Sequence, residues 1–399
     1  MRKSFFSALD VIPAKAGIQS FQSLLGSRFR KSGRFSEFFR ILLGPRGRKK
    51  SRFKGIRMLK RVKIEDAVGL KLAHDLTQIV PGQFKGAAFR RGYRIQKKDI
   101  PRLLDMGKKQ VYVLTLRPGE LHENEGARRM ARAVAGKSLR LRGPREGKID
   151  FIARHSGLLK IDTEAIARIN SIGGLILATR HNDSCVQAGE IVAGTRTIPL
   201  TIPEGKVRRV EAIGKRRAPV IEILPFGRKK VGIVVTGSEI YEKRIKDRSA
   251  EIVKKRIERF GSRVGKSVIV PDDPKRIALE IQKMKAQGCQ VIVTTGGLSV
   301  DPDDRTLAGI RRSGAKVIFY GVPVLPGSMS VYARLGKTVI LGAPACVVHD
   351  PTTALDLFLP RVLAGDSPTR QEMARLGHGG LCLKCPVCRY PVCPFGKMG

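Results

Sequence analysis

Residues 228–365 alternate short, continuous apolar runs with amphipathic stretches, and this alternation constrains the fold more than any other feature of the chain. The runs are VGIVVT, KSVIV, VIVTT, AKVIFY and TVILG, and the stretches predicted as helices are 249–260, 274–287, 303–313 and 351–363. Strands buried on both faces read as continuous apolar runs, and parallel strands need long crossover connections. The pattern therefore predicts an α/β fold, with a mainly parallel sheet between two helical layers.

The rest of the chain divides by composition. Residues 1–57 are rich in Lys and Arg and lack a sustained helical or strand period, so we expect a disordered or mis-assigned extension, with the folded chain starting near Met58. A basic arm for nucleic acid or a membrane is the alternative. Residues 58–146 predict a smaller α+β region, with helices near 99–106 and 120–136, and residues 147–227 predict mostly strands. Residues 366–399 form a cysteine-rich tail.

The formal net charge of +43 favours anionic partners. The basic residues are scattered, and no helix-turn-helix or aromatic–basic pattern stands out, so we expect nucleic-acid binding to lack specificity. No apolar run approaches the roughly 18 residues of a membrane span. Cys185, Cys289 and Cys346 are isolated among apolar neighbours and predict buried thiols, and this usage favours a cytoplasmic protein.

Polar and glycine residues follow the predicted strands where each one ends. In an open parallel sheet, ligands bind beyond the carboxyl ends of the strands, so we expect these loops to meet. The expected residues are Thr236, Gly237, Ser238 and Glu239 in the first loop, Asp272 and Asp273 in the second, and Thr295, Gly296, Gly297 and Ser299 in the third. Pro344 and Ala345 follow the last strand.

This set of residue types suits a phosphorylated ligand with a donor-rich ring. Glycines let backbone N–H groups approach an anion, and hydroxyls add hydrogen bonds. Carboxylates hold Mg²⁺ that bridges to phosphate, or accept hydrogen bonds from ring N–H groups. The alternative for each single loop is ordinary turn and helix-cap chemistry, which is also the preferred interpretation of His181, Asn182 and Asp183.

Five segments carry a resemblance to a known family. They are VVTGSEI (234–240), IKDRS (245–249), PDDP (271–274), TTGGLSVDPDDRT (294–306) and VPVLPGS (322–328). Residues 231–363 resemble the molybdopterin-binding superfamily, which includes molybdopterin adenylyltransferases, molybdopterin molybdotransferases and competence-damage-inducible proteins. Residues 58–226 are only distantly similar to the front of the molybdotransferases.

The resemblance implies roles for individual residues. It assigns the chemistry to Asp304, Glu239 and Asp272, and the binding of pterin, phosphate and Mg²⁺ to Thr236, Gly237, Ser238, Asp247, Asp273, Thr295, Gly296, Gly297, Ser299, Pro326 and Gly327. Either Asp272 or Asp273 matches the acid of the second loop. Two segments depart from the molybdotransferase pattern: Ser328 and Met329 replace a Lys-Pro pair, and 344–347 reads Pro-Ala-Cys-Val instead of Pro-Gly-Asn-Pro.

Three functions stay open at this point. The leading one is binding of molybdopterin, or its adenylylated form, with Mg²⁺ in molybdenum cofactor biosynthesis or insertion, as a molybdotransferase-like or adenylyltransferase-like protein. The second is a non-catalytic carrier or sensor with a nucleic-acid or protein partner, such as a molybdoenzyme. The third is a nucleotide pyrophosphatase or deamidase activity like that of the competence-damage branch. The resemblance also implies a homo-oligomer.

Four cysteines crowd the tail in the pattern Cys382-x-x-Cys385-x-x-Cys388-x-x-x-x-Cys393-Pro394. So dense a set predicts a metal site, because the tail has few aliphatic residues to bury the thiols. The spacing is similar to a bacterial iron–sulfur run, but its last gap is four residues and not three. Four thiolates also satisfy zinc, although zinc sites more often pair two separated knuckles. His378 could replace one thiolate, but its two glycine neighbours favour a loop residue.

Overall fold

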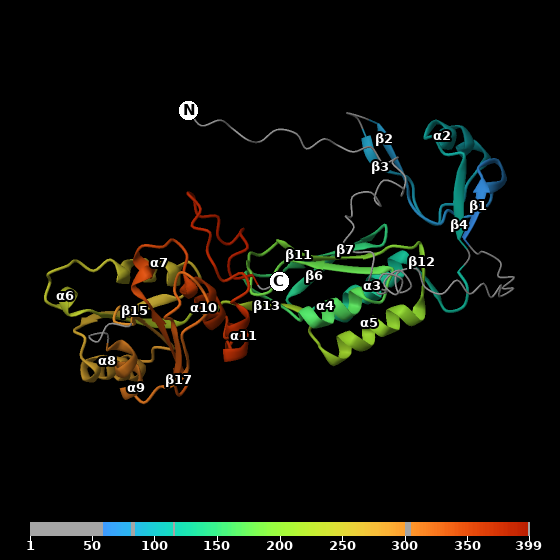
Figure 1. Cartoon of the computed structure of the whole chain (residues 1–399). Helices are drawn as coiled ribbons and strands as arrows, with labels where there is room; N and C mark the ends of the chain where they lie inside the picture. The colour runs from blue at the N-terminus through green and yellow to red at the C-terminus, as the bar shows by residue number, and fades with distance from the viewer. Residues whose placement is uncertain (1–58, 81–83, 115, 300–304, 398–399) are drawn as a thin grey trace, which may run out of the picture. The chain divides into compact units, whose positions relative to one another are not determined.

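The computed structural model describes residues 59–80, 84–114, 116–299 and 305–397 (Figure 1). The extension expected at 1–57 lies outside the described residues, as do Met58 and Asp304. Within these ranges no helix is both long and apolar enough to cross a bilayer.

A six-stranded sheet runs through the C-terminal part of the chain. The first four strands in sheet order are parallel to one another, and the last two are antiparallel to their neighbours. In sheet order they are β15 (Arg263–Val270), β14 (Lys230–Thr236), β16 (Val291–Thr295), β19 (Thr338–Ala343), β18 (Val331–Leu335) and β17 (Lys316–Tyr320).

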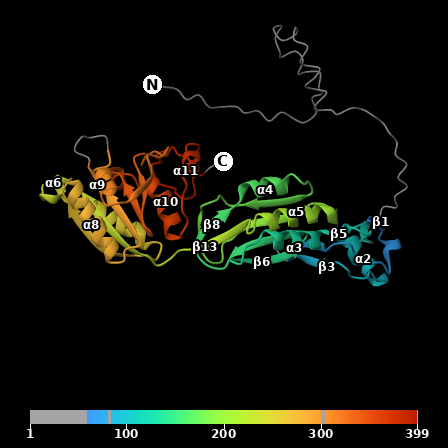
Figure 2. The ribbon, with the colours of Figure 1, turned by 90° about the horizontal axis from the view of Figure 1, so that it is seen from below.

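Helices cover both faces of this sheet (Figure 2). Alternate residues of β14 join different cores: Val231, Ile233 and Val235 pack with α7 and α10, whereas Val234 packs with α8 and α9. The helices are α6 (Ser238–Tyr241), α7 (Ser249–Glu258), α8 (Pro274–Ala286), α9 (Thr306–Arg312), η5 (Ala345–Val348), α10 (Ala354–Leu363) and α11 (Arg370–Arg375). The predicted three-layer α/β fold with a mainly parallel sheet is confirmed.

The antiparallel pair β18–β19 has no counterpart in the sequence prediction, which gave only the strand at 338–342. β18 contains Tyr332, Ala333 and the exposed Arg334, so it lacks a continuous apolar run. Leu335 pairs with Thr338 across the two residues Gly336 and Lys337. A connection this short can only join antiparallel neighbours, which is why the sheet reverses direction here.

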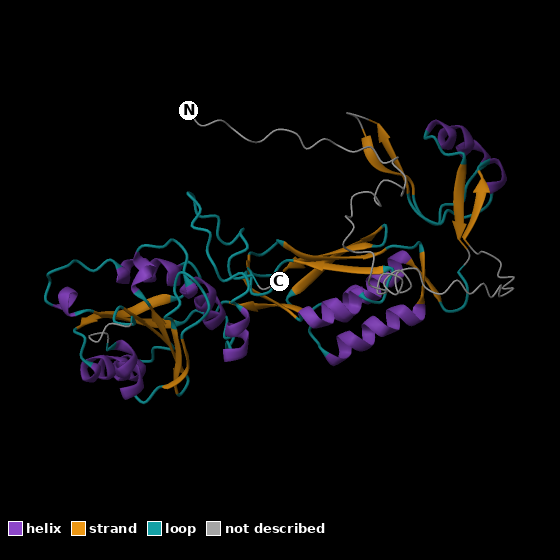
Figure 3. Cartoon of the chain, in the orientation of Figure 1, coloured by secondary structure: helices purple, strands orange, loops and turns teal. Residues whose placement is uncertain are grey.

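The middle part of the chain has one core, which runs from Ala127 to Ile223 and crosses the expected boundary after residue 146. Its strands are β5 (Glu120–His122), β6 (Leu139–Arg145), β7 (Lys148–Ala153), β8 (Gly157–Ile161), β9 (Leu175–Thr179), β10 (Cys185–Val186), β11 (Ile191–Thr197), β12 (Thr201–Pro203) and β13 (Ile221–Pro225). Its helices are α3 (Glu123–Val134), α4 (Thr163–Asn170) and α5 (Glu204–Arg216) (Figure 3).

Strands β7 to β13 occupy most of the regular structure in 147–227, as expected, but helices α4 and α5 were not predicted there. The Asp162 carboxylate accepts a hydrogen bond from the Ala165 N–H and so caps α4. In α5, Val207, Val210 and Gly214 are buried at helical spacing, although most of the segment is charged. A narrow apolar stripe on a basic helix resembles loop composition, which hides the helix from pattern reading.

Residues 59–114 form a smaller core of their own. It contains β1 (Leu59–Lys63), η3 (Glu65–Ala67), β2 (Leu76–Val80), β3 (Phe84–Phe89), η4 (Lys97–Asp99), α2 (Ile100–Asp105) and β4 (Gln110–Leu114). The helix after Asp99 follows the sequence prediction.

A network of ion pairs links β8 and the turn between β9 and β10 to α10, α11 and the residues between these two helices. The Arg361 guanidinium, only 4% exposed, contacts Asp366 at 2.6 Å, Glu372 at 3.2 Å and Asp183 at 3.7 Å. Lys160 contacts Asp183 at 2.7 Å and Asp366 at 3.0 Å. Burial alone would raise the pKa of Asp366, but Arg361 and Lys160 beside it bring that pKa below its usual value.

Candidate functional site

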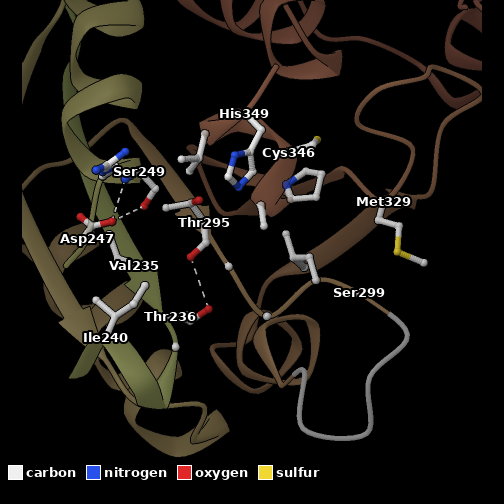
Figure 4. A pocket seen from close by; sticks show the side chains of 18 of the residues that line it. Val235, Thr236, Ile240, Asp247, Ser249, Thr295, Ser299, Met329, Cys346 and His349 are labelled. Carbon is white, nitrogen blue, oxygen red and sulfur yellow. Dashed lines mark hydrogen bonds between the residues drawn. The ribbon is translucent and has the colours of Figure 1, made fainter. Parts of the chain in front are cut away.

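The carboxyl ends of β14, β15, β16 and β19 open onto one cavity of about 1260 Å³ (Figure 4). The strand ends contribute Thr236 and Gly237, Asp272, residues 295–299 and residues 344–346. Residues 325–329 and part of the loop from Glu239 to Ser249 complete the wall. The four loops expected from the sequence therefore meet around one space, as the parallel order of these strands requires.

Asp272 combines a bound and an unbound oxygen in this cavity. Its Oδ2 accepts hydrogen bonds from the Ser238 N–H at 2.8 Å and the Ser238 hydroxyl at 3.2 Å. Its Oδ1 is buried but has no hydrogen-bond partner among the described residues. An unpaired buried oxygen is costly, so a ligand N–H or a cation that reached Oδ1 would offset that cost.

The turn after β16 brings backbone close to β14. Gly296 has φ +90°, and a Cβ there would lie 2.2 Å from the Thr236 carbonyl oxygen. Gly297 has φ +53°, and a Cβ there would lie 3.0 Å from Asp272 Oδ1. Only glycine fits both positions, so the backbone of this turn comes close to Thr236 and to the Asp272 carboxylate.

The side chain of Thr236, at the end of β14, contacts the residues on both sides of this turn. Thr236 is buried, and its Oγ1 lies 2.7 Å from Thr306 Oγ1. The same Oγ1 lies 3.4 Å from the Thr295 carbonyl oxygen (Figure 4). These contacts tie β14 to the residues on both sides of the glycine turn. The polar floor of the cavity is therefore held by hydrogen bonds within the protein.

The remaining predicted acids differ in how their oxygens are used. Asp247 lines the cavity, but its carboxylate already accepts hydrogen bonds from the Ser249 N–H and hydroxyl at 2.7 Å and from the Ala250 N–H. Asp273 does not line the cavity; its carboxylate accepts a hydrogen bond from the Lys275 N–H and caps α8. Of these two aspartates, Asp272 is therefore the one whose residue lines the cavity.

Other predicted residues fall into three groups. Glu239, Ser299, Pro326 and Gly327 line the cavity together with Asp272. Ser238 does not line it but holds Asp272. Asp304, predicted to close the motif, lies outside the described residues, and the helix expected from 303 is described only from Thr306.

Several cavity residues were not predicted as site residues. Met329, Cys346 and His349 line the cavity, as do the cationic Lys246 and Arg248 (Figure 4). Cys346 was expected to be a buried thiol; it is only half-buried, although burial still raises the pKa of its thiol. The available signal was its position directly after Pro344 and Ala345, in the loop that follows the last predicted strand.

The tail cysteines border a second, smaller cavity of about 140 Å³. Its walls include Cys382, Cys385, Cys388, Cys393 and residues 350–352. All four are free thiols; Cys385 and Cys388 are exposed, and the other two are half-buried. In the described part of the chain, no three His, Cys, Asp or Glu side chains are grouped closely enough to hold a metal ion as they stand.

Two family models match the chain. Residues 232–364 match "Probable molybdopterin binding domain", and residues 61–115 match "Domain of unknown function (DUF8806)".

Individual relatives cover only parts of the chain. The molybdopterin molybdenumtransferase of Synechococcus elongatus is 26% identical over 205 residues, which are 49% of this chain and 48% of that protein. A CinA-like protein of Mycobacterium sp. is 35% identical over 83 residues, which are 21% of this chain and 20% of that protein. The chain thus spans about half the length, or less, of these curated relatives. The crystal structure of the molybdopterin biosynthesis enzyme MoaB from Thermus thermophilus is 20% identical, with a TM-score of 0.29, and the match covers 35% of this chain and 98% of that one.

Proposed function

Because residues 232–364 carry a domain of the molybdopterin-binding type, we propose that this chain binds molybdopterin, or its adenylylated form, together with Mg²⁺, and acts in molybdenum cofactor biosynthesis or insertion. The observation that carries the proposal is the unpartnered Oδ1 of Asp272 beside the Gly296–Gly297 turn, at the edge where four strands of the described sheet end. This arrangement places a hydrogen-bond acceptor next to a glycine turn, whose backbone a ligand can approach closely.

The two halves of such a ligand would meet different groups. The phosphate would be bound by the backbone amides of the glycine turn, with Lys246 and Arg248 supplying positive charge from the cavity wall. The pterin ring offers N–H donors, and Ser299 and the backbone at 325–327 lie within the same cavity. A cavity of about 1260 Å³ has room for the adenylylated form as well.

Asp272 and Glu239 are the residues that would hold Mg²⁺. Both are carboxylates lining the cavity, and oxygen ligands are what this cation prefers. The orphaned Asp272 Oδ1 fits a cation, whereas the Asp247 carboxylate already accepts hydrogen bonds at the start of α7. When bound, Mg²⁺ neutralises phosphate charge, while Ser238 keeps Asp272 oriented. Asp304 retains the role implied by its match to the family motif.

Binding, and not a particular transfer reaction, is the core of the proposal. Ser328 and Met329 stand where molybdotransferases carry Lys and Pro, and Cys346 stands in the loop after β19. These positions lie in the wall of the cavity and not at its polar floor. Adenylyl or molybdate transfer is therefore an outcome to be measured. A non-catalytic carrier that delivers the cofactor to a molybdoenzyme is the second form of the same proposal.

The finer features belong to the same proposal. We expect the four tail cysteines to bind an iron–sulfur cluster or Zn²⁺, because four thiols share one cavity wall and the exposed Cys385 and Cys388 can rotate toward the other two. Free thiols persist in a reducing compartment, so we expect a cytoplasmic protein. A homo-oligomer is expected from the family resemblance.

The test compares two neighbouring carboxylates. Purified chain is titrated with molybdopterin, with and without Mg²⁺, using the wild type and the variants Asp272→Asn and Asp273→Asn. We expect Asp272→Asn to raise the Kd more than about tenfold, equivalent to about 1.4 kcal/mol, and to remove the Mg²⁺ dependence. Asp273→Asn should leave the Kd unchanged, because Asn also caps helices.

Two further variants extend this test. Glu239→Gln and Asp304→Asn should also weaken Mg²⁺-dependent binding while leaving the fold intact. Unchanged affinity in Asp272→Asn, Glu239→Gln and Asp304→Asn together would refute the site. Binding without any transfer activity would favour the carrier form.

A further inference from the structure

The tail exposes a group of apolar side chains, which we call the tail patch: Leu381, Leu383, Val387 and Val392. Their exposed fractions are 65%, 70%, 75% and 86%, the four highest values for large apolar side chains in the described part of the chain. All four lie between residues 381 and 392, in the red coil of Figure 1. Single exposed apolar residues are ordinary, whereas a group of them marks an interaction site.

A small apolar cavity accompanies the patch. It has a volume of about 140 Å³, and its walls include Leu381, Leu383, Tyr390 and Phe395. The inner wall is fixed to the domain, because Phe395 is buried in the core that contains α7 and α10 and the Tyr390 hydroxyl donates to the Asp356 carbonyl at 3.1 Å. An apolar cavity of similar volume holds one benzene molecule. This one therefore has room for a single leucine or aromatic side chain from a partner.

The charge around the patch is positive. Residues 376–399 contain Lys384, Arg389 and Lys397 but no Asp or Glu. Lys384 and Arg389 line the small cavity; Lys384 Nζ lies 3.6 Å from Asp350 Oδ1, whereas the Arg389 guanidinium makes no hydrogen bond or ion pair with a described residue. A partner with carboxylates beside its apolar residues is complementary to this surface, and a second copy would set cations against cations.

The patch lies beside the rim of the large cavity. Leu325 lines that cavity and is itself exposed. Its N–H donates to the Gly380 carbonyl, and its carbonyl accepts from the Cys382 N–H, both at 2.8 Å. Leu325 and Leu381 thus form a short parallel bridge. A partner seated on the patch is therefore next to the ligand of the large cavity.

We propose that the tail patch and the small cavity form a docking surface for an acidic protein partner. The partner inserts one bulky apolar side chain into the cavity, covers the exposed side chains and pairs a carboxylate with Arg389. Removal of these apolar groups from water drives the association, and the unpaired guanidinium selects for acidic partners. A fixed cavity suits a side chain of fixed position, which a fluid bilayer does not offer.

The role of this partner deepens the proposed function. A protein docked beside the rim of the large cavity would receive or supply the ligand held there. That role rests on the proposed function, whereas the docking surface itself does not.

The first experiment uses peptides as the partner. The full-length chain, kept reduced, is titrated with a short fluorescein-labelled peptide of Glu and Leu with one central Phe. Two matched peptides carry Lys in place of Glu, or Ala in place of Leu and Phe. We expect the acidic apolar peptide to show saturable anisotropy and a Kd at least about tenfold lower than either control, equivalent to about 1.4 kcal/mol.

Variants then locate the bound peptide. Leu383→Ser combined with Val387→Ser should raise the Kd at least about tenfold, and both positions are exposed, so the fold should be retained. Arg389→Gln should raise the Kd and reduce its salt dependence. Leu279→Ser, at an exposed position on α8, is the matched control and should leave the Kd unchanged. Hydrogen exchange should slow at 381–393 in the complex and stay unchanged in α8.

Three results would overturn the docking surface. Equal affinity for the Glu and Lys peptides would remove the charge argument, and an unchanged Kd in the double variant would place the peptide elsewhere. Co-sedimentation with phosphatidylglycerol vesicles, lost in the double variant, would make the patch a membrane contact. Concentration-dependent self-association, lost in the same variant, would make a second copy the occupant.

Molybdopterin titration separates this proposal from the proposed function. Leu383 and Val387 do not line the large cavity, so the double variant should keep the wild-type Kd for molybdopterin. Peptide binding without any binding of molybdopterin would support the docking surface and refute the proposed function. Molybdopterin binding without peptide binding would refute the docking surface alone.

Discussion

At the scale of single residues, the site depends on where glycine and aspartate stand relative to strand ends. A methyl group added at Gly296 would lie 2.2 Å from the Thr236 carbonyl oxygen, and Asp272 keeps one oxygen without a described partner nearby. The sequence placed these glycines in a loop after a buried strand, where several such loops in order predicted one ligand site. It could not choose between Asp272 and Asp273, since both follow the same strand. The direction of the backbone after Pro271 decides which aspartate lines the cavity and which one caps α8.

Substitution of Gly296 should show this constraint. Gly296→Ala combines a positive φ with overlap against backbone, so we expect it to lower the free energy of unfolding by about 3 kcal/mol and to abolish ligand binding. Gly288→Ala is the matched control, because Gly288 also has a positive φ but has no atom within 4 Å of the added methyl. It should cost only about 1 kcal/mol. Equal losses in chemical denaturation would show that the close approach to Thr236 has no energetic consequence.

At the scale of elements, strands that are buried on both faces could be predicted from the sequence. Elements that combine buried and exposed residues could not. β14, β16 and β19 read as apolar runs because nearly every side chain meets a helix or a neighbouring core residue. β18 includes an exposed arginine, and α5 has a narrow apolar stripe, so neither pattern stood out. The loop after β19 was predicted to end at the site, but it is held by Arg256, which lies 94 residues before Asp350, and no local pattern reports such a contact.

Removal of that arginine gives an element-scale prediction. Burial raises the pKa of Asp356, and Arg256 opposes this rise. Arg256→Gln leaves the carboxylate buried without its cation, so we expect a loss of about 3 kcal/mol in the free energy of unfolding at neutral pH and weaker ligand binding.

The pH dependence follows from the sign of that shift. A carboxyl group with a raised folded-state pKa destabilises the fold when ionised, so stability recovers as the pH falls through that pKa. The difference between wild type and Arg256→Gln should therefore shrink on acidification from neutral pH. The exposed Arg263, changed to Gln, should give a small, pH-independent difference. A gap that widens as the pH falls would contradict the assignment.

At the scale of the whole molecule, charge is the dominant property. The net charge of +43 is spread over the sequence. Scattered cations attract any polyanion but read no base edges, because specificity needs positioned contacts in a groove. The same charge also raises the local concentration of a phosphorylated ligand, which suits the proposed cavity.

We predict weak and unspecific association with nucleic acid. Fluorescence anisotropy with several unrelated duplexes should give similar Kd values of roughly 1–100 µM at physiological salt, rising steeply with salt concentration. The free cofactor or its analogue should not compete for this binding. Sub-micromolar affinity for one duplex over the others would instead indicate a nucleic-acid-binding function.

The ion network around Arg361 has a consequence for how this sequence can change during evolution. Its members come from two distant stretches of the chain: Lys160 and Asp183 from one, and Arg361, Asp366 and Glu372 from the other. Loss of a single member leaves a partly buried opposite charge without its partner. The five positions are therefore expected to change together during divergence. A gene fusion that joins this C-terminal domain to a foreign partner would keep the pairs of Arg361 with Asp366 and Glu372, but would lose the contact between Asp366 and Lys160. Chains in which the C-terminal domain stands alone should therefore keep Arg361 and carry fewer acidic residues around it.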